Sequence, residues 1–355
     1  MELTKKNILI ISPEAWGKNK LSKHHYAMHL AKRGNQVFFL QTNSEQGSPN
    51  SEHDHIKIIN YIPFKGISKL PEVLATRILK REWKRVINMM GIEPDLIWSF
   101  DNSVLFDLSL TSAISISHIV DLNQDYQFQR HAESAHLCLG STPYVLEKLK
   151  RFNPNSFFLN HGCVPRTQET VAKDHFIGIY IGNLNISYLD RGFIKILVAK
   201  FPEIQFTFIG AKNKSNLSTS VDEESERFIE WLEDQVNVEL TGTVEQQHLD
   251  KQLKKADFYF LAYKTEHHEQ VANPHKVMEL LSTGKLVLSF PLECYKDLNF
   301  PAIFGDFEAY LEGISQAKKG DQPFYNPHKK AQIDFALAHS YDEQIKRVEA
   351  CLKSL

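Results

Sequence analysis

The sequence predicts an α/β protein with two Rossmann-like domains, each a doubly wound parallel sheet covered by helices. Three observations support this fold class. Short apolar runs rich in β-branched residues alternate with helical patterns along the chain, as in doubly wound sheets. The alternation stops in a polar stretch between residues 160 and 174 and then resumes. The length of 355 residues exceeds what one small core organises, so two domains are expected.

In the first half, the apolar runs predict strands at residues 8–12, 37–41, 56–60, 96–99, 114–120, 137–139 and 156–159. Helical periodicity fits three of the intervals between them, at residues 20–33, 72–90 and 142–151. Gly34 and Gly91 directly follow the first two helices, where glycine commonly ends a helix. We expect this domain to comprise residues 1–165.

A second alternating series begins after the polar stretch. It predicts strands at residues 176–181, 205–209, 238–240, 258–261 and 286–289, and helices at 187–201, 222–234, 245–254 and 274–283. We expect a second domain at residues 166–335 and a closing segment at 336–355. Two such sheets facing each other leave a cleft at the carboxyl ends of their strands, where ligands of parallel sheets bind.

Composition excludes several classes of protein. A net charge of −2 and a pI near 6.8 give no basicity that favours nucleic acid. The apolar run at residues 8–11 is too short for a signal peptide, and no run approaches a membrane span. The histidine pairs lack metal-ligand spacing, so no metal site is expected. The scattered cysteines indicate reduced thiols in a cytoplasmic protein; they are Cys138, Cys163, Cys294 and Cys351.

Residues 273–284 carry the most informative pattern of the chain. Asn273 is a good N-cap and Pro274 suits the first helical position, with His275 and Lys276 completing the predicted helix start. Gly284 is placed to end the helix about three turns later. A strand-like run follows at once. The segment is therefore predicted to be a helix between a loop and a buried strand.

Lys276 and Glu279 share one strip of this helix, whereas Val277 and Leu281 point toward a core. A lysine in the first turn opposes the helix dipole, so an anion shared by the ammonium and the free N–H groups is the simplest explanation. Glu279, one turn deeper, would accept a hydrogen bond from a sugar hydroxyl. The segment thus suggests a nucleoside diphosphate site, although similar helix starts also occur in surface helices that bind nothing.

The second half resembles the GT-B glycosyltransferases, in particular the nucleotide-sugar-dependent retaining type of family 4 and its relatives. The resemblance rests on the order of four pieces: Ile179 to Leu184 with Asp190-Arg191-Gly192, then Phe206 to Gly210, then Val238 to Val244, and last the helix at 273–284 with its strand. Residues 340–349 also look like the family's final helix, which typically packs back onto the N-terminal domain. The resemblance covers about 110 residues in order, and each piece alone is weak.

The resemblance implies roles for individual residues. The Gly182 turn would let the backbone approach the phosphates, because no Cβ intervenes. Arg191 stands where the family often carries a diphosphate lysine or arginine, while the neutral Asn183 stands where many relatives have another basic group. A loop would take the base through backbone hydrogen bonds; it comprises Gly242, Thr243 and Val244. Glu279 matches the second glutamate of the family's paired motif and would hold the ribose.

One position departs from the family pattern. The first glutamate of the pair would lie eight residues before Glu279, at Val271, and valine cannot replace a carboxylate. Some relatives carry an Asn-Pro-x-Lys type of sequence here, which this chain matches. The departure leaves the contacts to the donor sugar open and keeps a non-catalytic interpretation in play.

In the N-terminal domain, the strand at 114–120 delivers His118 and Asp121 to the predicted cleft. In related enzymes a histidine or aspartate at this strand end faces the donor sugar, so both are candidate catalytic residues. The alternative for each is a structural role, which is the more common one for a lone histidine.

The segment from Lys65 to Arg85 is strongly basic, with seven basic residues and two acidic ones, a local charge of +5. On a helix, Arg77, Lys80, Arg81, Lys84 and Arg85 gather on one side and apolar residues on the other. The apolar stripe is expected to pack on the sheet. The basic face suggests contact with anionic lipid, each charge contributing about 1 kcal/mol near such a surface.

These expectations combine into one function. A cytoplasmic glycosyltransferase, soluble or peripheral at the inner face of the membrane, would move a sugar from a nucleoside diphosphate sugar to a glycan or lipid-linked acceptor. It would need no bound cofactor, and the resemblance implies retention of configuration without a metal ion. Two alternatives stay open: a nucleotide-sugar epimerase of the same architecture, and an inactive glycan-binding or assembly subunit.

Overall fold

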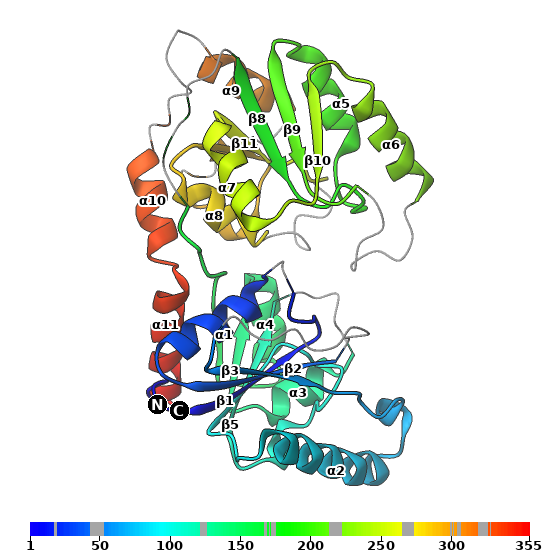
Figure 1. Ribbon diagram of the computed structural model, residues 1–355, viewed down its shortest axis with the longest axis vertical. Coiled ribbons are helices and arrows are strands. Elements are labelled where there is room, and N and C mark those ends of the chain that lie inside the picture. Colours follow the sequence, from blue (N-terminus) through cyan, green and yellow to red (C-terminus); the bar gives the residue numbers. More distant parts are fainter. Residues whose placement is uncertain are drawn as a thin grey trace. The chain divides into compact units, whose positions relative to one another are not determined.

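The computed structural model divides the chain into two compact units (Figure 1). Unit 1 comprises Met1–Gly162 and Tyr341–Leu355, and unit 2 comprises Cys163–Ser340. The structure describes residues 1–17, 20–42, 53–120, 126–166, 169, 171, 175–212, 222–264, 273–298, 300, 302–303, 307–318, 326 and 328–355. Each unit holds its own parallel sheet, which confirms the predicted fold class.

In unit 1, the described residues form a seven-stranded parallel sheet in the order β3-β2-β1-β4-β5-β6-β7. The strands are β1 Asn7–Ser12, β2 Gln36–Gln41, β3 Ile56–Asn60, β4 Leu96–Ser99, β5 Ile114–Ile119, β6 Leu137–Gly140 and β7 Ser156–Phe158. Every strand pair is parallel and in regular register. These strands are the apolar runs of the sequence, because a parallel sheet is buried on both faces.

Helices cover both faces of this sheet. They are α1 Ser22–Lys32, α2 Glu72–Met90, α3 Phe128–Ser134, α4 Pro143–Lys150 and α11 Tyr341–Lys353. Trp83 and Val86 of α2 pack with Leu9 and Ile11 of β1 in one cluster. On the other side, Tyr26 of α1 lies 4.7 Å from the Trp98 ring of β4 and 5.0 Å from the Tyr341 ring of α11. The sheet is thus sandwiched between helices.

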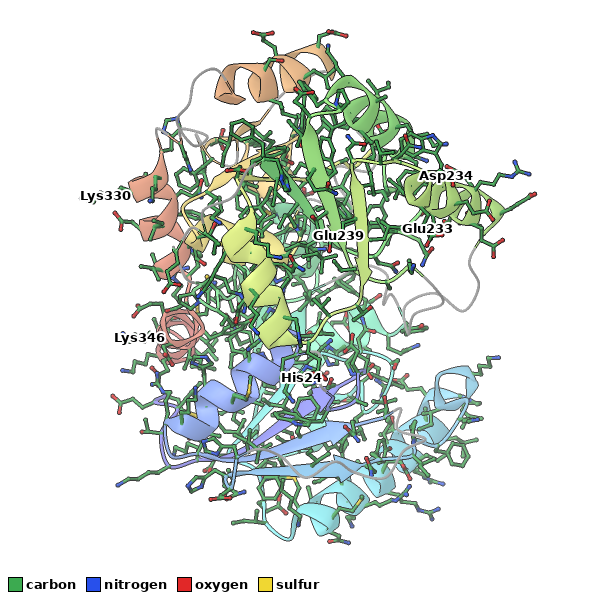
Figure 2. All side chains as sticks on the ribbon, turned by 45° about the horizontal axis from the view of Figure 1, so that its top comes forward. His24, Glu233, Asp234, Glu239, Lys330 and Lys346 are labelled. Atoms are coloured by element: carbon green, nitrogen blue, oxygen red, sulfur yellow. The ribbon has the colours of Figure 1, made fainter. Side chains whose placement is uncertain are left out.

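The described part of unit 2 holds a six-stranded parallel sheet in the order β10-β9-β8-β11-β12-β13. The strands are β8 Phe176–Ile181, β9 Ile204–Ile209, β10 Val238–Gly242, β11 Phe258–Phe260, β12 Leu286–Ser289 and β13 Ala302–Ile303. The helices are α5 Arg191–Lys200, α6 Glu223–Glu233, α7 Gln246–Lys255, α8 Lys276–Ser282, α9 Phe307–Lys318 and α10 Lys329–Leu337. Figure 2 shows Glu233 and Asp234 at the end of α6 and Glu239 on the edge strand β10.

Alternation along the strands builds a separate core on each face of this sheet. Tyr180 of β8 packs with residues of α5, α6 and α9, whereas its neighbour Ile179 packs with residues of α7, α8 and α10. Successive strand side chains point to opposite faces, so one strand serves both cores. Helix α8 belongs to the second of these cores, and its first residue, Lys276, lies beside Gly182 at the carboxyl end of β8.

The chain passes between the units at two places that lie side by side. Cys163 N donates to His339 O at 2.8 Å, and Cys163 forms a parallel bridge with Ser340. In unit 1, a Cβ on Gly162 would collide with the Tyr341 ring, so glycine is required there. Gln344 Nε2 donates to the carbonyl oxygens of residues 160 and 161, at 2.6 and 3.1 Å. Helix α11 is thereby anchored to unit 1.

Candidate functional site

The strand order of unit 2 locates a binding crevice. Strands β9 and β10 extend from β8 in one direction, and β11, β12 and β13 extend in the other. In open parallel sheets, ligands bind outside the carboxyl ends of the strands where the order reverses. Here that point lies between β8 and β11. Gly182 is the first residue after β8, so the glycine turn predicted from the sequence stands at the crevice.

Three glycines form a strip of bare backbone along the ends of β8, β9 and β10. Gly182 N donates to Ile209 O at 2.9 Å, and Gly210 N donates to Gly242 O at 3.0 Å. Gly210 has φ +151°, and a Cβ there would collide with the Gly182 carbonyl. Gly242 has φ +69°, which favours glycine. A phosphate can approach such a strip closely because no side chain intervenes.

The Lys276 ammonium lies directly beside the Gly182 turn. A Cβ on Gly182 would stand 2.8 Å from Lys276 Nζ and 2.6 Å from the Tyr180 hydroxyl oxygen. Lys276 Nζ donates to Ile181 O and lies 5.9 Å from the centre of the Tyr180 ring. Burial lowers the pKa of Lys276 to about 8, against the opposing effect of Glu279. The structure thus brings Lys276 to the backbone turn that the sequence singled out for phosphates.

Helix α8 begins later than the sequence predicts. Its first residue is Lys276, with His275 in the cap position, so the expectation of an Asn273 cap and a Pro274 start is wrong. The reason is a competing bond: Asn273 Oδ1 accepts from the buried Tyr295 hydroxyl at 3.0 Å. Pro274 contributes its carbonyl, which accepts from Val277 N at 3.0 Å.

The predicted end of α8 is confirmed. Gly284, with φ +72°, follows Thr283 after the helix, and its N–H donates to Leu281 O at 3.1 Å. Val277 and Leu281 are fully buried, while Lys276 and Glu279 are half-buried, as the helical strip predicts.

The Glu279 side chain is paired with Arg166, a residue from outside helix α8. Arg166 Nε donates to Glu279 Oε2 at 3.0 Å, and Arg166 Nη2 donates to the same oxygen. Arg166 Nη1 donates to Asp250 Oδ1 of α7 at 2.8 Å. Burial raises the pKa of Glu279, and the adjacent Arg166 guanidinium acts against that rise. Sequence reasoning missed Arg166 and Asp250, because no local pattern connects residues so far apart along the chain.

The Arg191 side chain forms its hydrogen bonds with residues outside the Gly182 turn. It is the first residue of α5, and its side chain is 5% exposed. Its guanidinium donates to Ser225 Oγ at 2.6 Å, to Ile186 O at 3.2 Å and to Glu224 Oε1 at 3.4 Å. These bonds join α5 to the start of α6. The diphosphate role of Arg191 therefore stays a prediction, and the observed contacts are structural ones.

The other predicted residues of unit 2 follow strands β8 and β10. Asn183 Oδ1 accepts from Asn185 N at 2.9 Å and so shapes the turn after β8. Beyond Gly242, Thr243 is exposed, and Val244 is half-buried against the core under α7 and α8. Val271 lies outside the described residues, so the departure at that position has no structural description.

In unit 1, His118 lies on β5 inside an aromatic cluster. Its side chain is almost fully buried, and Nδ1 accepts from Trp98 Nε1 at 3.2 Å. The Phe100 ring lies 4.7 Å away and the Tyr26 ring 5.8 Å away. Burial lowers the pKa of His118 to about 3, so the imidazole is neutral at physiological pH. Asp121, the other catalytic candidate, lies outside the described residues.

A second polar group lies where the order of the sheet in unit 1 reverses, between β1 and β4. Glu14 follows β1 and forms an ion pair with Lys23 of α1. Asp101 follows β4, and its Oδ1 accepts from Ser103 N at 2.8 Å and Ser103 Oγ at 2.5 Å. Burial raises the pKa of Asp101, with Glu14 adding to the rise and Lys23 opposing it.

Comparison with solved structures identifies the architecture. Sucrose-phosphate synthase from Thermosynechococcus elongatus is 13% identical with a TM-score of 0.69, and the match covers 98% of each chain. An α,α-trehalose-phosphate synthase from Burkholderia vietnamiensis is 10% identical with a TM-score of 0.70, covering 100% of this chain and 99% of that one. The Anabaena protein HepE in complex with UDP and glucose is 11% identical with a TM-score of 0.68, covering 99% and 100%.

The chain has the GT-B fold. No protein-family model matches it, and no curated protein matches it by sequence. Identities of 10–13% establish the GT-B fold and leave the activity to the side chains of the site. Within the residues that the structure describes, no three His, Cys, Asp or Glu side chains are arranged to hold a metal ion. In the same residues, no helix combines the length and apolar character needed to cross a membrane.

Proposed function

We propose that the protein is a glycosyltransferase that moves a sugar from a nucleoside diphosphate sugar to a glycan or lipid-linked acceptor. The observation that carries this proposal is the site beside Gly182, where bare backbone and the Lys276 ammonium meet at the reversal of strand order. The GT-B fold and the HepE complex with UDP and glucose support it. A site of this composition suits a diphosphate: the backbone allows close approach, and the ammonium supplies charge.

In the proposed reaction, the bond between the anomeric carbon of the donor and the diphosphate oxygen breaks. The oxygen of an acceptor hydroxyl forms the new bond to that carbon, and the hydroxyl proton leaves with the diphosphate or to water. Negative charge develops on the departing diphosphate, and the Lys276 ammonium would stabilise it. Glu279 would accept a hydrogen bond from the ribose. The resemblance of the sequence to retaining relatives supports retention of configuration.

Nucleotide binding tests the proposal most directly. Thermal unfolding with UDP, GDP and ADP should show stabilisation by at least one of them, about 2.7 kcal/mol at 100 times its dissociation constant. The nucleoside diphosphate sugar carrying the same base should then release that diphosphate in the presence of acceptor sugars. We expect EDTA to leave this release unchanged. The absence of any stabilisation by the three nucleotides would contradict a nucleoside diphosphate site.

Two rival functions make different predictions for donor turnover. An epimerase converts the donor sugar with no acceptor present, whereas a transferase turns over efficiently only with one. An inactive glycan-binding or assembly subunit converts nothing under either condition. Chromatography of the donor, with and without an acceptor, therefore separates the three possibilities in one experiment.

We also propose that α2 contacts anionic membranes, which would place the protein in the cytoplasm or at the inner face of the membrane. The basic residues of the helix and of the segment before it are exposed; they are Lys65, Lys69, Arg77, Lys80, Arg81, Lys84 and Arg85. Exposed apolar side chains accompany them, with Ile62 at 74% and Phe64 at 53%. Arg85 Nη1 donates to Ile62 O at 3.2 Å, so this segment lies against the helix. Basic and apolar groups together suit the interface of an anionic bilayer.

Vesicle sedimentation tests the membrane contact. Binding to anionic vesicles should fall between low and high salt, because the attraction is screened over about 8 Å at physiological ionic strength. Replacing Lys80, Lys84 and Arg85 with glutamine should weaken it. The matched control replaces three exposed lysines elsewhere in unit 1, namely Lys150, Lys346 and Lys353. Binding that ignores both salt and the first set of substitutions would refute an electrostatic contact.

A further inference from the structure

The segment that enters unit 2 is fixed along helix α8 by its backbone and by one thiol. Cys163 Sγ donates to Met278 O at 3.4 Å. Arg166 N donates to Ser282 Oγ at 2.9 Å, and that hydroxyl donates to Glu279 O at 2.7 Å. Because both ends of residues 163–166 are bonded to one helix, the Arg166 side chain leaves from a fixed point beside Glu279.

The Arg166 guanidinium binds Glu279 through one oxygen. Nε and Nη2 both donate to Glu279 Oε2, while Nη1 is directed to Asp250. The Arg166 side chain is 7% exposed and that of Glu279 is 12% exposed, so this pair is sheltered from water. Within the described part of the chain, Glu279 Oε1 forms no hydrogen bond. One carboxylate oxygen is therefore fixed, and the other is available as an acceptor.

The charges around Glu279 depend on Arg166. Burial and the nearby Asp250 both raise the pKa of Glu279, whereas Arg166 and, to a smaller extent, Lys276 lower it. Without Arg166, the Glu279 carboxyl would stand in a sheltered position close to another carboxylate, a combination that favours its neutral form. A neutral carboxyl is a weaker hydrogen-bond acceptor than a carboxylate.

We infer that Arg166 is a positioning residue, which holds the Glu279 carboxylate so that Oε1 accepts a hydrogen bond from the ribose of the donor nucleotide. The inference rests on the proposed function and adds a residue to its nucleotide site. Arg166 itself touches no ligand in this arrangement. It acts by orienting Glu279 through two donors on one oxygen and by keeping the carboxyl ionised, while Asp250 occupies the remaining end of the guanidinium.

The test compares nucleotides with and without ribose hydroxyls. Calorimetry would measure the dissociation constants of the tightest binder among UDP, GDP and ADP and of its 2′,3′-dideoxy counterpart, between pH 6 and 8. For the wild type, removal of the hydroxyls should weaken binding about tenfold. Arg166→Met should reduce that ratio to about twofold at pH 6 and recover part of it at pH 8, as Glu279 ionises. Glu279→Ala should abolish the ratio at every pH.

Two further variants separate positioning from general structural damage. Arg166→Lys keeps the positive charge but cannot place two donors on one oxygen, so the ratio should fall without acquiring the pH dependence. Arg130→Met is the matched control: it removes a guanidinium that donates to Asp107 Oδ2 at 2.8 Å in unit 1, and it should keep the wild-type ratio. Thermal unfolding of each variant establishes that it is folded. If Arg166→Met does not fold, the comparison is made with Arg166→Lys.

Two results would overturn the inference. One is an Arg166→Met variant that discriminates between the two nucleotides as the wild type does at every pH. The other is an equal loss of affinity for both nucleotides, because a merely structural residue would produce that. Failure of the proposed function is a different result: the wild type would then bind none of the three nucleoside diphosphates, and the role assigned to Arg166 would fall with it.

Discussion

Replacement of Lys276 by methionine tests the centre of the proposed site. Methionine keeps the length of the side chain and removes the charge that lies beside the Gly182 turn. A hydrogen bond to a charged group contributes about 1.5–3 kcal/mol. We therefore expect the dissociation constant of the best-binding nucleoside diphosphate to rise about 10- to 150-fold in Lys276→Met at pH 7.

The pH dependence of binding provides a sharper form of the same test. With a pKa of about 8, Lys276 is about nine-tenths protonated at pH 7 and about one-tenth protonated at pH 9. A diphosphate prefers the protonated form, so affinity should be constant below pH 8 and decline above it. In Lys276→Met this decline should disappear. Calorimetric titrations at pH 6, 7, 8 and 9 would show both effects.

The free energy of unfolding should increase with pH above pH 8, whereas nucleotide affinity decreases there. The pKa of Lys276 in the folded protein lies below its ordinary value of 10.5, so folding disfavours the charged form. The free energy of unfolding from this group should therefore rise between pH 8 and 10.5 in the wild type and not in Lys276→Met. At pH 7 we expect the Tm of the variant to equal or exceed that of the wild type.

A second lysine provides the matched control. Lys285 Nζ donates to the carbonyl oxygens of Leu253 and Lys254 at the end of α7, at 2.7 and 2.8 Å. Lys285→Met should lower the Tm and leave nucleotide affinity unchanged. The reasoning on Lys276 would be refuted by a Lys276→Met variant whose affinity lies within threefold of the wild type at pH 7, or by a decline above pH 8 that persists in that variant.

Gly182→Ala should weaken nucleotide binding as strongly as Lys276→Met does, because the site has no room for a Cβ. Gly192→Ala should bind nucleotide normally in the same titration, because its Cβ would meet only Asp190 Oδ1, at 3.6 Å. His118→Ala should reduce donor turnover far more than nucleotide affinity if that strand end faces the sugar, and full activity would remove His118 from catalysis. Gly162→Ala should lower the free energy of unfolding by about 1–3 kcal/mol, measured by urea denaturation, because its Cβ would collide with the Tyr341 ring; an unchanged midpoint would contradict this.

Much of the architecture could be predicted from local patterns. The apolar runs at 56–60, 96–99, 176–181 and 286–289 are strands with those bounds, and helix Glu72–Met90 ends at Gly91, which has φ +76°. Parallel strands and amphipathic helices carry their burial in consecutive residues, so the pattern is visible without the fold. Helices α3, α9 and α10 were not predicted. In α10 the amphipathic pattern is weak, so its sequence gives little sign of a helix; the helix is stabilised by packing against α8.

Helix starts were harder to predict than helix existence. Helix α5 was expected from residue 187 but begins at Arg191, because Asp190 accepts from Phe193 N at 2.9 Å and caps the helix there. At α8, the expected cap Asn273 is bound instead by Tyr295. In both cases a single side-chain hydrogen bond decides the boundary, and the sequence holds more than one residue able to make it.

The contacts of the candidate site could likewise be predicted only in part. The proximity of Gly182 and Lys276 could be expected, since the ends of neighbouring elements in a parallel sheet meet. The pairing of Arg166 with Glu279 could not, because it joins residues 113 positions apart and depends on how residues 163–166 lie along α8. The direction of the Arg191 guanidinium, toward Ser225, likewise depends on packing between two helices.

The position of α11 in unit 1 has a consequence for biosynthesis. Leu3 N donates to Glu349 Oε1 at 2.6 Å, and Arg33 Nη2 donates to the same oxygen at 2.7 Å. A ribosome makes unit 2 in full before it makes the helix that completes unit 1. During those seconds of translation, the α1 side of unit 1 lacks α11, and Tyr26 lacks the Tyr341 ring that packs on it in the finished protein. Unit 2 can thus fold before unit 1 acquires the helix that completes it.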